Sequence, residues 1–251
     1  MRARGVSLLG LALAFALVLP ACSGGVEDDT PNLSGSRAVT FAARDGVALQ
    51  GRLFGEGGTA VVLSHMLPAD QRSWFDFAQR LADQGYLVLT FDFRGYCPGG
   101  DGGCSQGERN ISSIWQDVLG ATDFVRSEGA TQVALVGASM GGTASLVAAA
   151  QDADARAVVT LSAPTSIEGL VVDPATLSAN AAGKLFIAGV GDASAAASAQ
   201  ELYDESPPPK RVEIVPADDH GTDLLTGPQG EVVRRLIENY LLQFAPPTTT
   251  E

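Results

Sequence analysis

The stretch QVALVGASMGG, residues 132–142, decides the fold class of this chain. It opens as a mostly apolar run typical of a buried strand, and from Met140 onward small and apolar residues follow at helical spacing. Between the two lies a Gly-X-Ser-X-Gly turn centred on Ser139. A serine on a tight turn between a strand and a helix stands at the strand's carboxyl end. The stretch therefore predicts that Ser139 is a nucleophile, whereas a glycine-rich loop that merely contains a serine would lack the flanking strand and helix.

The glycines of this turn are explained by its geometry. Gly137 and Gly141, with Gly142 behind them, leave room for the strand and the helix to pass close to each other. Ser139 then stands at a helix N-terminus, where the backbone N–H of Met140 can donate to a developing oxyanion.

Outward from this stretch, short apolar runs alternate with helical patterns. The predicted strands are residues 38–43, 47–54, 60–64, 86–91, 132–136, 157–161, 184–188 and 211–215. The predicted helices are residues 72–84, 111–127, 140–151, 194–203 and 231–244. This alternation predicts an α/β fold, a doubly wound and mostly parallel sheet of about eight strands with helices on both faces. The turn Arg44-Asp45-Gly46 adds an antiparallel hairpin at one edge.

The connection between the strands at 157–161 and 184–188 limits what can cover the site. Residues 162–183 have room for at most one short helix and a loop, around 166–170 and 174–179. We therefore expect no large cap domain over Ser139.

Residues that follow strands are the candidates for chemistry, because ligands bind such sheets at the carboxyl ends of the strands. A serine hydroxyl needs a base, and the chain has two histidines, His65 and His220. His220 follows the last strand and so shares the carboxyl edge with Ser139. Asp192 follows the strand at 184–188 and can orient the imidazole.

Three alternative orienting carboxylates lie close to His220 in sequence: Asp218, Asp219 and Asp223. Neighbouring residues rarely reach an imidazole in the right geometry, so we expect Asp192 to orient it. The chain order Ser139, Asp192, His220 is the order found in one large family of serine hydrolases.

The domain at residues 38–245 resembles the α/β-hydrolases, in particular their small esterase and dienelactone-hydrolase-like members. The pieces that match are Ser64-His65-Met66-Leu67, Phe91-Asp92-Phe93-Arg94-Gly95, the turn around Ser139, Asp192 and His220. The resemblance implies a Ser-Asp-His triad that hydrolyses an ester or related acyl bond of a small substrate through an acyl-enzyme. It also implies an oxyanion hole formed by the backbone N–H groups of Leu67 and Met140, with no metal and no cofactor. The family often has His-Gly where this chain has His65-Met66.

Two further expectations concern the matching segments. His65 can be a second base, but we expect it to order the oxyanion loop, because a neutral imidazole offers one donor and one acceptor. We expect Asp92 and Arg94 to form a structural pair rather than to take part in catalysis.

Composition limits the partners. The 251-residue chain has a formal net charge of −13, whereas a nucleic-acid binder needs a basic face, so we expect no nucleic-acid partner. The expected partner is a small acyl substrate, and peptide, thioester and lactone bonds remain alternatives to an ester on the same triad. A lipid-anchored binding protein on an inactive hydrolase scaffold would show a broken triad, and here each member is present.

Residues 1–21 are typical of an export signal. Arg2 and Arg4 precede an apolar run at 6–19, which is shorter than the about 20 residues that a membrane-spanning helix needs. The run ends Leu19-Pro20-Ala21-Cys22, which resembles the lipobox of bacterial lipoproteins, where the cysteine carries the lipid. We therefore expect an exported lipoprotein, anchored to a cell-envelope bilayer through acylated Cys22, with the domain on the extracytoplasmic side. The alternative is an ordinary cleaved signal with a bystander cysteine.

The remaining segments fit an exported domain. A polar tether at 22–37 and a short tail at 246–251 flank it. Cys97 and Cys104 lie in a glycine-rich loop, and we expect a disulfide between them because disulfides persist outside the cytosol. Free or metal-bound thiols are the alternative, but two histidines in the whole chain leave few partners for zinc.

Overall fold

The computed structural model describes Met1 and residues 33–97, 103–151 and 154–249. Apart from Met1, the predicted signal lies outside the described residues, as do Cys22, most of the tether and the last two residues of the tail. In the part of the chain that is described, no helix is both long and apolar enough to cross a membrane.

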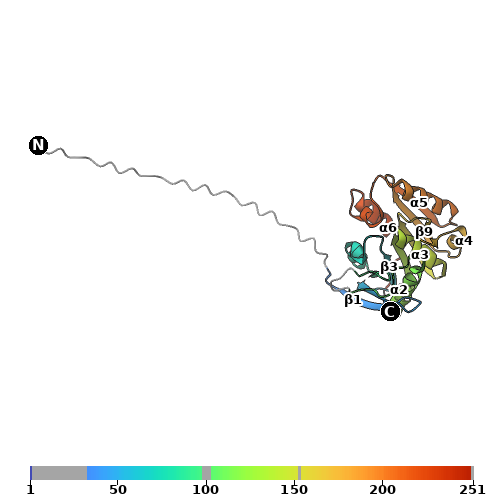
Figure 1. Cartoon of the computed structure of the whole chain (residues 1–251), viewed down its shortest axis with the longest axis horizontal. Helices are drawn as coiled ribbons and strands as arrows, with labels where there is room; N and C mark the ends of the chain where they lie inside the picture. Colours follow the sequence, from blue (N-terminus) through green and yellow to red (C-terminus); the bar gives the residue numbers. More distant parts are fainter. Residues whose placement is uncertain (2–32, 98–102, 152–153, 250–251) are drawn as a thin grey trace. The chain divides into compact units, whose positions relative to one another are not determined.

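An eight-stranded sheet forms the centre of the domain (Figure 1). Its strands are β1 (Ser36–Ala42), β2 (Ala48–Phe54), β3 (Thr59–Ser64), β4 (Leu87–Phe91), β5 (Gln132–Ala138), β6 (Ala155–Leu161), β9 (Gly183–Gly189) and β10 (Lys210–Val215). They lie in the order β1-β2-β4-β3-β5-β6-β9-β10, and every neighbouring pair from β4 to β10 is parallel. β2 pairs antiparallel with β1 and β4, and Ala42 opposite Ala48 closes the predicted hairpin. The predicted doubly wound, mostly parallel sheet of about eight strands is confirmed.

Helices cover both faces of this sheet. They are α1 (Phe75–Ala82), α2 (Trp115–Ser127), α3 (Met140–Gln151), α4 (Pro174–Ser178), α5 (Ala193–Glu205) and α6 (Gly230–Phe244), with the 3-10 turns η1 (Gln71–Trp74), η3 (Ile111–Ser113) and η4 (Gly221–Leu225). Apolar side chains of α2, α3 and α5 share one core cluster, and those of α1 and α6 share another.

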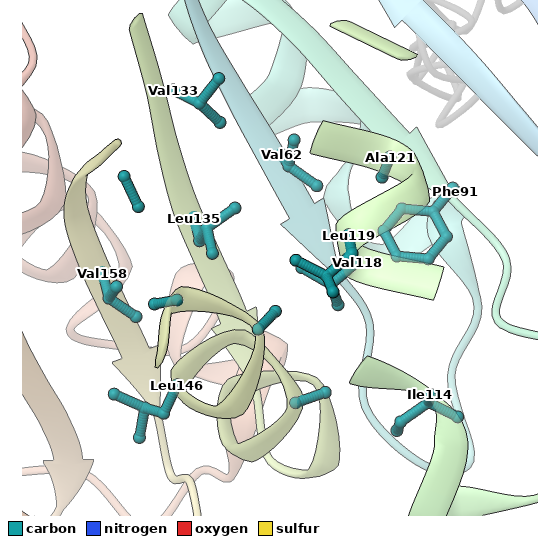
Figure 2. Close-up of a cluster of buried hydrophobic side chains, with 14 of the residues drawn as sticks. Val62, Phe91, Ile114, Val118, Leu119, Ala121, Val133, Leu135, Leu146 and Val158 are labelled. Carbon is teal, nitrogen blue, oxygen red and sulfur yellow. The ribbon is translucent and has the colours of Figure 1, made fainter. Parts of the chain in front are cut away.

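The strands are apolar on both sides because each side faces one of these clusters. In β5, Val133 and Leu135 point into the first cluster, while Ala134 and Val136 point into the second. Figure 2 shows part of the first cluster, where side chains of β5, α2 and α3 form one apolar layer. The strand that leads to Ser139 is therefore fixed from above and below.

The connection from β6 to β9 differs from the prediction in one place. Residues 166–170 form no helix; instead β7 (Ser166–Ile167) and β8 (Leu170–Val171) make a small antiparallel hairpin. Its two turn residues, Glu168 and Gly169, have φ values of 44° and 85°, and two successive left-handed residues are typical of a tight hairpin turn. One short helix, α4, is present in the connection, and no large cap is inserted here, as predicted.

Candidate active site

Ser139 lies on the turn between β5 and α3 with a φ of 50°. A left-handed φ is uncommon for a residue other than glycine and persists where the surroundings enforce it. Here the Ser139 N–H donates to the Leu161 carbonyl of β6 at 2.8 Å, and the Ser139 carbonyl accepts from the Gly142 N–H at 2.9 Å. A neighbouring strand and the first turn of α3 therefore hold the strained backbone in place.

The glycines beside Ser139 are required by close backbone contacts. A Cβ atom at Gly137 would lie 2.3 Å from the Gly141 carbonyl oxygen, and one at Gly141 would lie 2.4 Å from the Ser64 carbonyl oxygen. Both distances are far shorter than a van der Waals contact, so a side chain at either position would force the backbone apart. The second contact also shows that the start of α3 lies against the end of β3, where the expected oxyanion loop begins.

His220 and Asp192 come together at the ends of neighbouring strands. Nδ1 of His220 lies 2.5 Å from Oδ2 of Asp192, and Oδ1 of Asp192 accepts a hydrogen bond from the Ala195 N–H at 3.2 Å. The carboxylate is thus shared between the imidazole and the first turn of α5. The His220 side chain is 43% exposed and that of Asp192 is 19% exposed, so the imidazole can be reached from solvent while the carboxylate is partly covered.

The three carboxylates near His220 in the sequence are not bonded to its ring in the described structure. Among the described residues, none of Asp218, Asp219 and Asp223 bonds to the His220 ring. The Asp218 carboxylate packs against Gly191, where a Cβ would meet it at 1.8 Å, and that of Asp219 packs against Gly227.

Gly221 places the His220 segment next to the carboxyl ends of β3, β5 and β6. It has a φ of 57°, and its N–H donates to Oγ of Ser162 at 3.0 Å. A Cβ on this glycine would lie 2.4 Å from Sδ of Met66 and 3.4 Å from Cβ of Ala138. The residue after His220 therefore touches both the residue before Ser139 and the loop that follows β3.

His65 is fully buried and fixes this loop. Its Nδ1 lies 2.9 Å from the Met66 carbonyl oxygen, and its Nε2 accepts the Phe93 N–H at 3.2 Å. These two bonds require a neutral ring with the proton on Nδ1. Burial lowers the pKa of His65 to about 4, in spite of the bond to Met66. These contacts agree with a role in ordering the loop and argue against a second base.

The two expected oxyanion donors lie on the segments that meet here. Met140 is the first residue of α3, and Leu67 follows the Met66 carbonyl that His65 holds. The Leu67 and Met140 amides donate no hydrogen bond to any residue that the structure describes. Within the described residues, neither N–H group therefore has an intramolecular acceptor.

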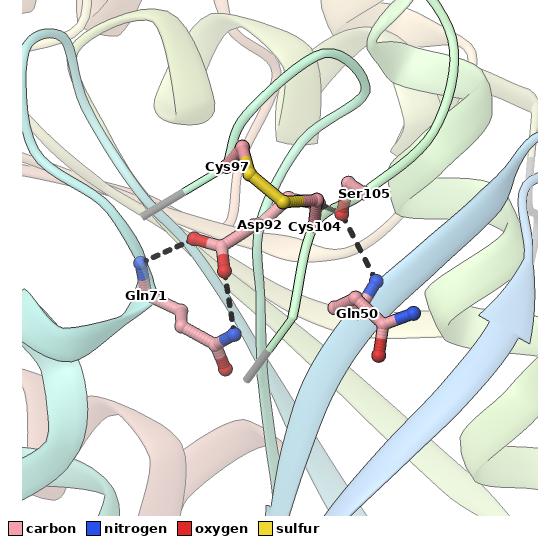
Figure 3. The surroundings of a disulfide bond; sticks show 6 residues. All are labelled: Gln50, Gln71, Asp92, Cys97, Cys104 and Ser105. Atoms are coloured by element: carbon pink, nitrogen blue, oxygen red, sulfur yellow. Dashed lines mark hydrogen bonds between the residues drawn. A yellow bond between two sulfur atoms is a disulfide. The ribbon is translucent and has the colours of Figure 1, made fainter. Parts of the chain in front are cut away.

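Asp92 and Arg94 do not form the pair that the sequence suggested. Asp92 accepts hydrogen bonds from the backbone and side-chain nitrogens of Gln71, at 2.9 and 2.6 Å (Figure 3). Arg94 bonds to Asp117 of α2 and to Asp45 of the β1–β2 turn, each at 2.8 Å. The two side chains therefore bond to different partners, and all of these partners are distant in the sequence. Burial raises the pKa of Asp92 to about 6, although the Gln71 bonds oppose the shift.

Cys97 and Cys104 form a disulfide, as predicted, with their Cα atoms 4.1 Å apart (Figure 3). Ser105, the next residue, donates its hydroxyl to the Asp92 carbonyl at 2.6 Å and accepts the Gln50 N–H at 2.9 Å. The residue next to the disulfide is therefore bonded to Asp92, which follows β4, and to Gln50 of β2.

Two cavities lie at the opposite edge of the sheet, so we assign them no part in the chemistry. They measure about 490 and 500 Å³, share Glu56 and Gly57, and open near the amino ends of β3 and β4. Within the described part of the chain, no group of three or more His, Cys, Asp or Glu side chains could hold a metal ion.

A serine on a strained turn after the central strand, on a sheet of this order, defines the class: the protein is a hydrolase of the α/β-hydrolase fold. Residues 57–214 match the protein family described as serine aminopeptidase, S33, and the chain belongs to that family.

Solved structures support the fold. An esterase of Pyrococcus furiosus is 17% identical, with a TM-score of 0.68 over 83% of this chain and 91% of its own. A dienelactone hydrolase of Anabaena variabilis is 21% identical, with a TM-score of 0.67 over 83% of this chain and 97% of its own. An α/β-hydrolase of a Penicillium species is 17% identical, with a TM-score of 0.67 over 83% and 98%. No curated protein matches the sequence.

Proposed function

We propose that this hydrolase cleaves esters of small acyl groups with Ser139 as nucleophile, His220 as base and Asp192 as the orienting carboxylate. The observation that carries the proposal is the 2.5 Å contact between His220 and Asp192 at the edge where Ser139 lies. Gly221 supports it, because a Cβ on this residue would lie 3.4 Å from Cβ of Ala138, so the His220 segment lies close to the serine turn.

In the proposed reaction, Oγ of Ser139 attacks the carbonyl carbon while Nε2 of His220 takes the hydroxyl proton. Asp192 holds Nδ1 and stabilises the imidazolium. The N–H groups of Leu67 and Met140 donate to the negative oxygen of the tetrahedral intermediate. His220 then gives its proton to the leaving alcohol, and an acyl-enzyme remains. Water, deprotonated by His220, attacks this ester, and the carboxylic acid leaves as Ser139 regains its proton.

An oxygen ester is favoured because one structural neighbour is an esterase and another a dienelactone hydrolase, whose lactone bond is a cyclic ester. A peptide bond is the second candidate, because the family is described by an aminopeptidase. Thioesters and lactones would use the same residues. A catalytically silent binding protein fits less well, since it would not need the strained backbone of Ser139.

The deciding experiment is labelling with a fluorophosphonate, which forms a covalent bond to an activated serine. The wild-type chain should be labelled at Ser139 and Ser139→Ala should not, and a panel of ester, thioester, lactone and aminoacyl substrates should then rank the bonds. A wild-type protein that resists the probe and cleaves none of the panel would contradict the proposal.

We also propose that the protein is exported and held on the extracytoplasmic side of a membrane by lipid on Cys22. The Cys97–Cys104 disulfide supports the compartment, because such bonds are rare in the cytosol. Cys22→Ala should move the protein from the membrane fraction to the soluble fraction. If that variant stays with the membrane, another segment is the anchor.

A further inference from the structure

We propose that Tyr96 is a positioning residue that fixes the relative orientation of the two proposed oxyanion donors. It acts on the Leu67 N–H through His65, and on the Met140 N–H through the Met140 side chain. The inference rests on the proposed function, because it concerns the same oxyanion hole. Tyr96 lies beyond the end of β4, and no sequence pattern distinguishes it from an ordinary core aromatic.

Tyr96 contacts both segments that carry these donors. Its ring meets the His65 imidazole nearly edge to face, with 4.6 Å between centroids and 69° between planes. Its phenolic oxygen lies 3.9 Å from Sδ of Met140, within range of a weak O–H to sulfur hydrogen bond. Met140 follows Ser139 and carries one of the two proposed N–H donors. One side chain therefore packs between the two segments that must face the same oxygen.

The contact between Tyr96 and His65 affects the Leu67 N–H through a single peptide unit. The Met66 carbonyl and the Leu67 N–H belong to the same planar peptide group, so fixing one fixes the direction of the other. His65 fixes the carbonyl with its 2.9 Å bond from Nδ1. The imidazole is held in turn by the Phe93 amide on Nε2 and by the rings of Phe93 and Tyr96. The segment after β4 thus sets the direction of the Leu67 N–H.

Tyr96 is itself firmly held, as a positioning residue must be. It is 5% exposed, its N–H donates to the Phe93 carbonyl at 3.1 Å, and its carbonyl accepts the Ser105 N–H at 2.9 Å. The guanidinium of Arg109 lies 4.1 Å from the centre of its ring. The bond to Ser105 sits beside the Cys97–Cys104 disulfide, and Figure 3 shows Ser105 bonded to β2 through Gln50.

A purely structural role for Tyr96 predicts a different result from a positioning role. Loss of packing would lower stability and reduce turnover of all substrates alike. Loss of oxyanion-hole geometry would affect the step in which negative charge develops on the carbonyl oxygen. A thionoester places that charge on sulfur, which is larger and a weaker hydrogen-bond acceptor. The ratio of kcat/KM for an ester to that for the matched thionoester therefore reports on the oxyanion hole.

The experiment uses the full chain with Tyr96→Leu, which removes both contacts, and Tyr96→Phe, which removes the contact with Met140. Phe54→Leu is the matched control, because Phe54 is a buried aromatic of β2 whose ring packs on Phe75 and which lies opposite Val88, near the start of β4. Tyr96→Leu should lower kcat on the ester about 10- to 100-fold, less than the about 10²- to 10³-fold expected on losing an oxyanion donor. KM should stay nearly constant and the ester-to-thionoester ratio should fall. Tyr96→Phe should change both quantities in the same direction by less, and Phe54→Leu should leave the ratio at the wild-type value.

An ester-to-thionoester ratio in Tyr96→Leu equal to that of Phe54→Leu would overturn the proposal. If Tyr96→Leu fails to fold, Tyr96→Phe decides, and an unchanged ratio in that variant overturns it. These outcomes differ from a failure of the proposed function, which would show in the wild-type chain as the absence of fluorophosphonate labelling and of ester hydrolysis.

Discussion

The carboxylate of Asp192 lies 2.5 Å from Nδ1 of His220 and at the same time receives the Ala195 N–H at the start of α5. A single side chain thus orients the proposed base and caps the helix that follows β9. The position of the imidazole is therefore coupled to the position of a helix, and the two roles can be separated by substitution.

Replacement of Asp192 by asparagine and by alanine should separate them. Asparagine caps helices about as well as aspartate, but its amide favours the wrong imidazole tautomer, so Asp192→Asn should keep its stability and lose kcat by about 10⁴-fold. Asp192→Ala should lose similar activity and also about 1 kcal/mol of cap stabilisation, which lowers Tm by about 2–4 °C. Steady-state kinetics and thermal unfolding measure the two effects. Equal melting temperatures for the two variants would show that the cap contributes nothing.

The strained backbone of Ser139 predicts an unusual stability order. Ser139→Ala and Ser139→Gly should both lose kcat by about 10⁶-fold, and adding His220→Ala should reduce it little further, because the residues act as a unit. At a φ of 50°, however, alanine keeps the left-handed strain and glycine does not. Ser139→Gly should therefore be more stable than Ser139→Ala by about 1 kcal/mol. Urea unfolding measures the difference, and equal stabilities would mean that the turn relaxes when the serine is removed.

Asp92 should make the protein less stable as the pH rises. Burial raises its folded-state pKa to about 6, above its usual value of 3.8, so the folded chain holds this proton at pH values where the unfolded chain has released it. The stabilising contribution is complete below about pH 4 and is lost as the pH rises toward 6. Asp92→Asn cannot titrate at this position. The free energy of unfolding of wild type minus that of Asp92→Asn should thus fall between pH 4 and pH 6 and stay level above. A difference that is constant over this range would contradict the raised pKa.

The sequence predicted those parts of the site that depend on local pattern and chain order. Gly137, Ser139 and Gly141 lie at fixed spacing where β5 ends and α3 begins, and the parallel sheet brings the residues after β9 and β10 to the same edge. The pairs that join distant segments were not predictable. Arg94 bonds to Asp45 and Asp117, which lie 49 and 23 residues away in the sequence. The sequence alone does not distinguish these partners from the nearby Asp92.

Two other features depended on conformations that residue type does not indicate. The pattern at 166–170 is compatible with a short helix, but Glu168 adopts a left-handed φ and the segment forms a hairpin. Glutamate rarely adopts this φ, so tertiary packing rather than local propensity decided the outcome. Tyr96 was missed for a similar reason, since its contacts with His65 and Met140 exist only once β3, β4 and β5 are side by side.

The connection between β6 and β9 leads to a prediction about substrate size. It consists of the β7–β8 hairpin and the five-residue helix α4, and Glu168 at the hairpin tip is exposed and charged. The hairpin packs toward η3, since a Cβ at Gly169 would lie 3.5 Å from Cβ of Ser112. These elements make a rim rather than a cover. A site with little enclosing apolar surface binds long acyl chains weakly.

We therefore expect hydrolysis of soluble short-chain esters and no rise in activity when the substrate aggregates. The measurement is a series of p-nitrophenyl esters from acetate to palmitate, run below and above the aggregation point of each ester, with Ser139→Ala as the blank. For short chains, kcat/KM should be highest, because each added methylene gains about 0.8 kcal/mol only when it is buried, and here it stays in water. An increase of kcat/KM with chain length, together with a sharp rise at the interface, would mean that the hairpin or a neighbouring loop closes over the acyl chain.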